Sequence, residues 1–183
     1  VVIDVPISEE ESFTATIRPK KEDYEGEDRK TAGKPYILNA DGNKTETDKN
    51  PTHIDWTVRV NDNMATYENA KVVDDLGEGL KIVEDSFVVE KIIRDHKNEE
   101  IGREKVDVFT LAITDEGFEL ELGSVKDAYE ITYTTTVDRP EGGGRHKINN
   151  NAKIILDDDE TEVRDDFEKY AISKISITKI IIR

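Results

Sequence analysis

The sequence predicts an all-β protein built as a sandwich of two packed sheets. Many short runs alternate between apolar and polar side chains, which is the period of a strand with one buried face. Turn residues, mainly Gly, Asn and Asp, separate these runs, and no stretch shows a helical period. We expect about eight to ten short strands, as is typical of a β-sandwich.

The first part of the chain predicts short strands joined by polar segments. Residues 1–20 contain two strand-like pieces. The run KTAGKPYIL at 30–38 predicts a short strand broken at Gly33 and Pro35, because both residue types interrupt regular strand pairing. Residues 39–52 are polar, and we expect a solvated loop there.

Residues 54–89 form the stretch around which the rest is organised. A strictly alternating strand at 54–60 is followed, after a polar turn, by a second strand at 70–74. Alternation in this second strand places the carboxylate of Asp74 on the face that otherwise carries apolar side chains. A glycine-containing turn then leads to a third strand, which we expect to end at 86–88.

The same pattern continues toward the C-terminus. A polar hairpin arm is predicted over 90–105, followed by a strand pair over 106–122 with its turn at 114–117. Residues 129–137 alternate as a further strand, and a flexible connection follows at 138–145.

The last predicted strands bring a second polar residue onto an apolar face. The strand at 148–154 places the amide of Asn150 beside apolar side chains. An acidic loop at 157–160 then leads to a strand-rich stretch at 170–182. The alternation predicts a core that contains Trp56, Val58, Val72, Phe87, Ile131 and Tyr133.

Composition excludes several classes of partner. The net charge of −16 argues against nucleic acid, whose phosphates would be repelled, and against contact with an anionic membrane surface. The chain has no cysteine, so it contains neither disulfides nor thiolate metal sites. No apolar run approaches the ~20 residues that a membrane-spanning helix needs. Because the chain begins at Val1 rather than methionine, we interpret it as an excised part of a longer protein.

The sequence carries no motif of an enzyme, a metal site or a cofactor site. Its histidines, His53, His96 and His146, are isolated in polar segments, and no nucleophile elbow, phosphate loop or zinc spacing is present. The acidic run at 157–160 is better explained as a solvated loop than as a calcium site, because calcium requires a shaped set of oxygen ligands. A hydrolase or a lectin-like enzyme on a β-sandwich would need paired carboxylates or a metal. We therefore expect no enzymatic activity, no metal and no cofactor.

Asp74, Asn150 and the lysines of 30–38 remain as candidates for a functional site. Each has a structural explanation by itself. A carboxylate at a strand end can accept backbone hydrogen bonds, an amide can close a turn, and a lysine near a strand start is usually solvated. Their order along the chain, however, matches a wider pattern.

Five short motifs carry that pattern: Lys30-Thr-Ala-Gly33, Trp56 to Asn61, Asp74-Asp-Leu-Gly-Glu-Gly-Leu80, Tyr133-Thr-Thr-Thr-Val137 and Asn150-Asn-Ala152. In this order they resemble the collagen-binding-type, Ig-like domains of Gram-positive cell-wall adhesins, with Gly77 standing where that family usually has proline. The resemblance covers residues 30–154 and implies an Ig-like β-sandwich. It predicts one domain over 29–183, preceded at 1–28 by an N-terminal strand segment or the remnant of another domain.

Many domains of this family carry an intramolecular isopeptide bond between a lysine and an asparagine, promoted by a nearby acid. The resemblance assigns Lys30 as nucleophile, Asp74 as acid/base and Asn150 as electrophile. Burial favours this chemistry because it disfavours charge, which leaves a neutral amine and a protonated acid. Fixed proximity can supply ~7–11 kcal/mol of the barrier. The alternatives are Lys34 for the lysine and, on the outward faces of the same strands, Asp75 and Asn151.

The resemblance also implies a location and a function. We expect an extracellular domain on the cell-wall surface that binds a host extracellular matrix protein, collagen or similar, next to neighbouring adhesin domains. The alternative is a purely mechanical stalk or pilin-like spacer without a ligand of its own. Fold alone does not specify a ligand, and the sequence has no signature that separates the two.

Overall fold

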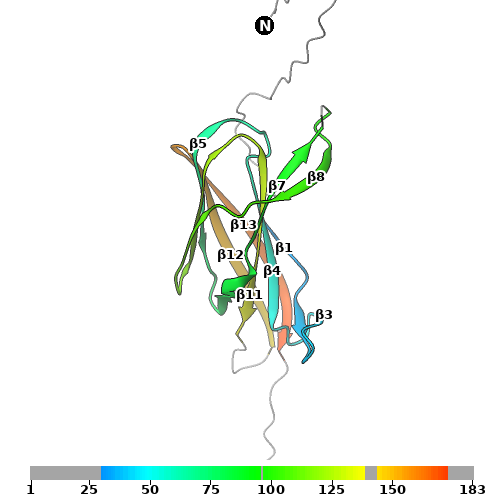
Figure 1. Cartoon of the computed structure of the whole chain (residues 1–183). Helices are drawn as coiled ribbons and strands as arrows, with labels where there is room; N and C mark the ends of the chain where they lie inside the picture. The colour runs from blue at the N-terminus through cyan, green and yellow to red at the C-terminus, as the bar shows by residue number, and fades with distance from the viewer. Residues whose placement is uncertain (1–29, 96, 139–143, 173–183) are drawn as a thin grey trace, which may run out of the picture.

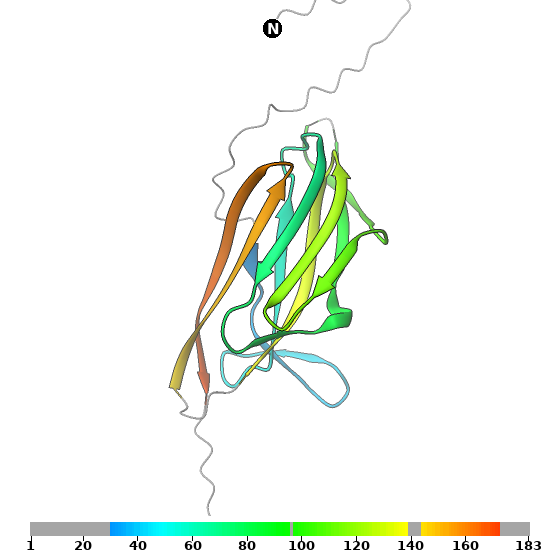
Figure 2. The same ribbon diagram turned by 90° about the vertical axis from the view of Figure 1, so that its left-hand side faces the viewer.

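The described chain folds into two antiparallel sheets packed face to face (Figure 1, Figure 2). The computed structural model of the protein describes residues 30–95, 97–138 and 144–172, with the backbone alone described at 144–146 and 161–172. This part of the chain contains thirteen strands and one short 3-10 helix. The predicted all-β sandwich is therefore confirmed.

The larger sheet contains eight strands, which are β1 (Lys30–Ala32), β2 (Tyr36–Leu38), β3 (Lys44–Glu46), β4 (His53–Val60), β6 (Leu80–Ile82), β7 (Val88–Arg94), β8 (Glu100–Lys105) and β11 (Ala128–Val137). Six of them run in the order β3-β2-β4-β11-β7-β8. β1 pairs with β4, and β6 pairs with β11. β7 and β8 form a hairpin that extends away from the body of the sandwich, in agreement with the polar arm predicted over 90–105 (Figure 1).

The smaller sheet contains five strands, which are β5 (Tyr67–Asp75), β9 (Thr110–Ile113), β10 (Gly117–Val125), β12 (Gly144–Leu156) and β13 (Asp159–Ile172). Their order is β13-β12-β5-β10-β9, so β5 lies at the centre with β12 and β10 on its two sides. Figure 2 shows the long β12–β13 hairpin at one edge of this sheet.

The core lies between the inward faces of the two sheets and closely follows the predicted alternation. Trp56, Val58, Val72, Ile131 and Tyr133 are at most 1% exposed. The sixth predicted core residue, Phe87, is half-buried and packs against the core at its border. Because β7 begins only at Val88, Phe87 lies just outside the regular pairing of the sheet.

Two segments predicted from polarity differ from the structure. The loop predicted over 39–52 contains β3, which pairs with β2 through its backbone although all three of its side chains are exposed. The acidic loop predicted at 157–160 is shorter, because β13 begins at Asp159. Asp157 makes the tight turn with a φ of 56°, a left-handed conformation that aspartate tolerates, and its carboxylate accepts hydrogen bonds from the backbone N–H groups of Glu68 and Asn69.

The third strand of the central stretch is also interrupted. The 3-10 helix η2 (Glu84–Ser86) separates β6 from β7 where a strand ending at 86–88 was predicted. The N–H of Ser86 donates to the carbonyl of Val83 at 3.0 Å, and the Ser86 hydroxyl accepts from the N–H of Thr134 at 2.8 Å. These hydrogen bonds replace the strand pairing that the alternating sequence suggested.

Some predictions fall on parts of the chain that the structure does not describe. They concern the segment 1–28, His96, most of the connection at 138–145, and residues 173–182 of the strand-rich stretch. The division of the chain at 28 and 29 therefore stays a prediction.

Gly77 passes close to the backbone of β12, the strand that carries Asn150. A Cβ at position 77 would lie 1.7 Å from the carbonyl oxygen of Asn149, so only glycine allows this approach. The contact places the chain that leaves β5 directly against β12. It therefore fixes the ends of the two strands that carry Asp74 and Asn150.

We predict that Gly77→Ala lowers the free energy of unfolding by about 2 kcal/mol or more, because two backbone segments must move apart. Gly102→Ala in β8 is the matched control, since its new Cβ would meet nothing closer than the Ile93 side chain at 4.0 Å. Denaturant midpoints of the two variants provide the measurement. Equal midpoints would contradict this account of the β12 contact.

Candidate functional site

Four polar side chains meet inside the sandwich. Lys30, Asp74 and Asn150 are 1%, 3% and 1% exposed, and Tyr133 is 1% exposed. β1 and β11 supply the lysine and the tyrosine from the larger sheet, whereas β5 and β12 supply the aspartate and the asparagine from the smaller sheet. The cluster therefore joins the two layers in the middle of an otherwise apolar core.

The strand register explains why these four residues converge. Within the larger sheet, Lys30 pairs with Val58, and Tyr133 pairs with Trp56, so the two side chains flank β4 from opposite sides. Within the smaller sheet, Asp74 pairs with Ala152, which makes Asn150 its diagonal neighbour. Diagonal neighbours on one face of a sheet lie within reach of each other's longer side chains.

Three hydrogen bonds in series connect the amine to the amide. Lys30 Nζ donates to Asp74 Oδ2 at 2.5 Å, and the Tyr133 hydroxyl donates to the same oxygen at 2.6 Å. Asn150 Nδ2 donates to the Tyr133 hydroxyl oxygen at 3.0 Å. The nucleophile, the acid and the amide assigned from the sequence are thus brought together in one buried cluster.

Two oxygens of the cluster lack hydrogen-bond partners. Asp74 Oδ1 and Asn150 Oδ1 are both buried and accept no hydrogen bond from any described residue. A buried acceptor without a donor is unfavourable by about 1–3 kcal/mol. The cluster therefore holds two buried acceptors, one on the acid and one on the amide, that no described donor satisfies.

The electrostatics of the site favour neutral groups. Burial raises the pKa of Asp74, and this effect outweighs the opposing influence of the Lys30 charge and of the hydrogen bonds from Lys30 and Tyr133. Burial and the nearby Asp74 carboxylate together raise the pKa of the Tyr133 hydroxyl well above its ordinary value. The Lys30 amine thus lies 2.5 Å from a carboxyl group whose pKa burial has raised.

Aromatic rings form the walls around the amine. Lys30 Nζ lies 5.4 Å from the centre of the Trp56 ring and 6.0 Å from that of Tyr133. The Phe87 ring stacks on Tyr133 at 5.4 Å, and the Phe118 ring meets Tyr133 edge-on at 4.9 Å. These rings keep the polar groups in a medium of low polarity.

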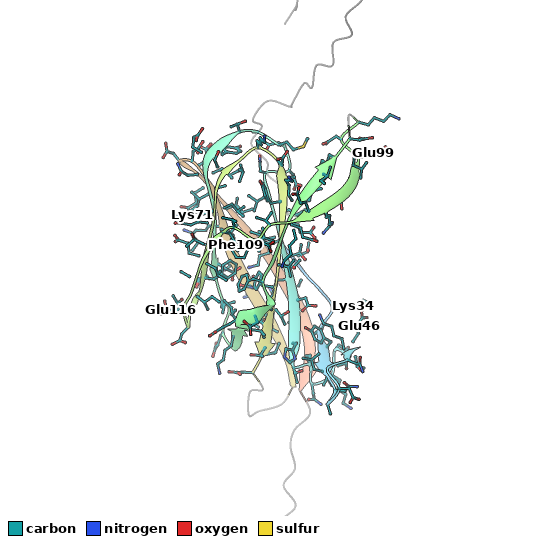
Figure 3. All side chains as sticks on the ribbon, viewed as in Figure 1. Lys34, Glu46, Lys71, Glu99, Phe109 and Glu116 are labelled. Carbon is teal, nitrogen blue, oxygen red and sulfur yellow. The ribbon has the colours of Figure 1, made fainter. Side chains whose placement is uncertain are left out.

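The alternative residues named from the sequence lie elsewhere. Lys34 is exposed and forms an ion pair with Glu46 at 3.1 Å, near β3 (Figure 3). Asp75 and Asn151 are exposed on the outer face of the smaller sheet. Sequence reasoning placed Tyr133 in the core but missed its hydroxyl as part of the site. The available signal was that a tyrosine on a buried face needs a polar partner.

A broad groove lies on the outer face of the smaller sheet, behind the buried cluster. Its volume is about 940 Å³. Its lining combines small apolar side chains with charges of both signs and includes Val73, Asp75, Ala112, Glu119, Asn151 and Lys153. Glu116, in the turn between β9 and β10, also lines the groove, and its position in the fold is labelled in Figure 3. Strand alternation therefore gives β5 and β12 two roles, with the polar cluster on one face and the groove on the other.

The described residues offer little support for other kinds of site. Within them, no group of three or more His, Asp or Glu side chains is arranged to hold a metal ion. No helix in the described part is long and apolar enough to cross a membrane.

Comparison with known proteins gives a family match. The model of a family described as collagen binding domain matches residues 40–166, which include Asp74, Tyr133 and Asn150, whereas Lys30 precedes the match. No curated protein matches the chain.

Several solved structures are similar. The collagen-binding subdomain of the Enterococcus faecalis surface protein ACE shares 17% identity, over 67% of this chain and 88% of that one, with a TM-score of 0.46. The collagen-binding domain of a Staphylococcus aureus adhesin shares 9% identity, over 63% and 87% of the two chains, with a TM-score of 0.46. The T6 backbone pilin of Streptococcus pyogenes shares 15% identity, over 78% and 35%, with a TM-score of 0.44.

We predict that the buried amine, and not its exposed neighbour, stabilises the fold. With Asn150→Ala present in every chain, Lys30→Met should lower the free energy of unfolding by about 3–5 kcal/mol, because it leaves Asp74 buried without its cationic partner. Lys34→Met, the control, should change it by no more than about 0.5 kcal/mol. Denaturant unfolding measures the free energy of unfolding of both variants. Equal losses would contradict the claim that the buried Lys30–Asp74 pair stabilises the fold.

The loss of stability in Lys30→Met should also depend on pH, whereas that in Lys34→Met should not. Without the amine, the folded-state pKa of Asp74 lies further above the unfolded value of about 3.9, so the folded variant holds its proton more tightly. The stability that this proton confers is complete below the unfolded pKa and is lost as the pH rises through the folded pKa. The deficit of Lys30→Met should therefore be smallest in acid and grow toward neutral pH.

Proposed function

The chain belongs to the collagen-binding domain family, and from this premise we propose that it is an extracellular adhesin domain that binds host collagen or a similar matrix protein. It acts on the Gram-positive cell-wall surface, beside neighbouring adhesin domains. An isopeptide bond between Lys30 and Asn150, promoted by Asp74, locks its two sheets together. The observation that carries the crosslink is the buried series of hydrogen bonds from the Lys30 amine to the Asn150 amide.

The proposed reaction uses the buried groups in their neutral forms. Lys30 Nζ passes a proton to Asp74 Oδ2 and attacks Cγ of Asn150 as a free amine. The protonated Asp74 polarises the Asn150 carbonyl, and ammonia departs as the new amide forms. An amide is a weak electrophile, but fixed proximity of the reactants can supply ~7–11 kcal/mol of the barrier.

The crosslink would suit a domain that bears load. It would close a loop of about 120 residues, and by the chain-entropy estimate for disulfides such a loop adds about 5 kcal/mol of stability. It joins β1 of one sheet to β12 of the other, so pulling on the chain could not separate the layers without breaking a covalent bond. A cysteine-free chain has no disulfide to serve this purpose.

The groove on the smaller sheet supports a binding role. A collagen triple helix is an extended rod of three polyproline-type chains with its backbone well exposed. An open groove lined by small side chains and by charges of both signs offers shape and polar contacts to such a rod. Because β12 lines the groove and also carries Asn150, the covalent bond would hold this part of the binding face rigid.

We predict that the purified protein has a mass lower by one ammonia than its sequence requires. Lys30→Ala, Asp74→Ala and Asn150→Ala should each restore the full mass, since each removes one reacting group. Lys34→Ala and Asp75→Ala are the exposed controls and should keep the reduced mass. Intact-mass spectrometry distinguishes these states, and a wild-type protein of full mass would rule out the crosslink.

We predict that collagen binding depends on the groove. Ala112→Arg places a long charged side chain in the groove and should abolish binding to immobilised collagen in surface plasmon resonance. Thr45→Arg, in exposed β3 of the other sheet, should bind as the wild type does. Absence of wild-type binding to collagen, fibrinogen and fibronectin, alone and with the neighbouring domains, would instead favour the mechanical spacer.

A further inference from the structure

The hydroxyl of Tyr133 occupies a position that the crosslinking reaction described above does not use. It lies between the acid and the amide, 2.6 Å from Asp74 Oδ2 and 3.0 Å from Asn150 Nδ2. The hydroxyl thus donates to the acid and accepts from the amide, so it connects the two groups directly. Among the hydrogen bonds described for Asn150, this hydroxyl is the partner of its amide nitrogen.

We propose that Tyr133 is a catalytic residue of the crosslink, which relays a proton from Asp74 to the departing nitrogen of Asn150. This inference rests on the proposed Lys30–Asn150 bond and adds the group that completes it. The chemical need is clear. The amide nitrogen cannot leave as an anion, so a proton must reach Nδ2 before the bond between Cγ and nitrogen breaks.

The direction of the hydrogen bonds allows this transfer once the amine has attacked. In the planar amide, Nδ2 only donates, and the Tyr133 hydroxyl accepts from it. In the tetrahedral intermediate the same nitrogen is an amine with a free lone pair, so it becomes an acceptor. Asp74, now protonated, donates to the Tyr133 oxygen, which frees the hydroxyl proton to move to Nδ2.

The protons and bonds of the sequence balance. Lys30 Nζ begins as an ammonium and first gives a proton to the Asp74 carboxylate. Its lone pair then forms the bond to Cγ of Asn150, and the carbonyl electrons move to Oδ1. Tyr133 gives its proton to Nδ2 and takes the one held by Asp74, after which Asp74 takes a second proton from Nζ. The carbonyl re-forms, ammonia leaves, and Asp74 ends protonated beside the new amide.

The surroundings of Tyr133 favour a relay over an independent acid. Burial and the Asp74 carboxylate raise the pKa of the hydroxyl, so a free phenolate is strongly disfavoured. The hydroxyl therefore releases its proton only as it receives another. Stacking on Phe87 and the edge contact with Phe118 hold the ring, and with it the hydroxyl, between the two reacting groups.

Tyr133→Phe tests the relay, because it keeps the ring and removes only the hydroxyl. We expect the crosslinking rate to fall by about 100-fold, the lower end of the range for the loss of a proton-transfer group. Tyr36→Phe is the matched control: its hydroxyl also donates to a carboxylate, Asp55 Oδ1, at 2.7 Å, but outside the cluster. Chains made by cell-free synthesis are sampled over time, quenched in denaturant and weighed for the loss of ammonia.

The outcomes separate the relay from the crosslink itself. If the wild type never loses ammonia, the proposed bond is absent. If the wild type crosslinks and Tyr133→Phe does so at the same rate, the bond stands and the relay is overturned. Folding of Tyr133→Phe is checked by circular dichroism and by comparing its melting with that of Asn150→Ala, which also lacks the bond.

A second variant keeps the relay testable if Tyr133→Phe does not fold. Site-specific 3-fluorotyrosine at position 133 preserves the ring and the hydroxyl but makes the hydroxyl more acidic. Because the hydroxyl both gives and receives a proton in the relay, a crosslinking rate that differs from that of the wild type supports proton transfer through this group. An unchanged rate would overturn it.

Discussion

The contact between the Lys30 amine and the Asp74 carboxyl group is the interaction on which the rest of the structure depends. Two groups of opposite charge lie 2.5 Å apart in the centre of an apolar core, where neither is solvated. Such pairs add little net stability, because the cost of desolvation offsets their attraction. Removing one partner, however, strongly destabilises the fold, because the other charge stays buried. The pair therefore constrains the packing of the two sheets, since β1 and β5 must place the amine and the carboxyl group in contact. In the proposed crosslink, the same contact lets the amine pass its proton to the acid.

The remaining features of the fold fix this contact in place. The register of β1 on β4 positions the amine, and the pairing of β5 with β12 positions the acid beside the amide. Gly77 and Gly117 let backbone segments approach the carbonyl oxygens of Asn149 and Asp74 more closely than any other residue would allow. Aromatic side chains then enclose the polar groups and keep them in a nonpolar medium. The outer faces of the same strands are left free to form the groove.

Period-2 alternation was sufficient to predict much of this arrangement from the sequence. It gave the inward face of the long strands, and so placed Asp74 and Asn150 inside while Asp75 and Asn151 faced out. It could not choose between Lys30 and Lys34, because the breaks at Gly33 and Pro35 interrupt the alternation between them. The role of the Tyr133 hydroxyl depends on contacts between the two sheets, which strand patterns within one sheet do not encode. β3 was missed for a related reason, since a strand paired only through its backbone leaves no pattern of burial.

The most direct test of the account is to sequence the junction between Lys30 and Asn150 in a tryptic digest by tandem mass spectrometry. Lys34 precedes Pro35, and a crosslinked Lys30 resists cleavage, so the lysine lies in a peptide that covers 30–44. The amide lies in a peptide that covers 148–153. The account predicts one branched species in which these two peptides are joined through Lys30 and Asn150, with the loss of one ammonia. Separate linear peptides covering 31–44 and 148–153, or a junction through Lys34, would contradict it.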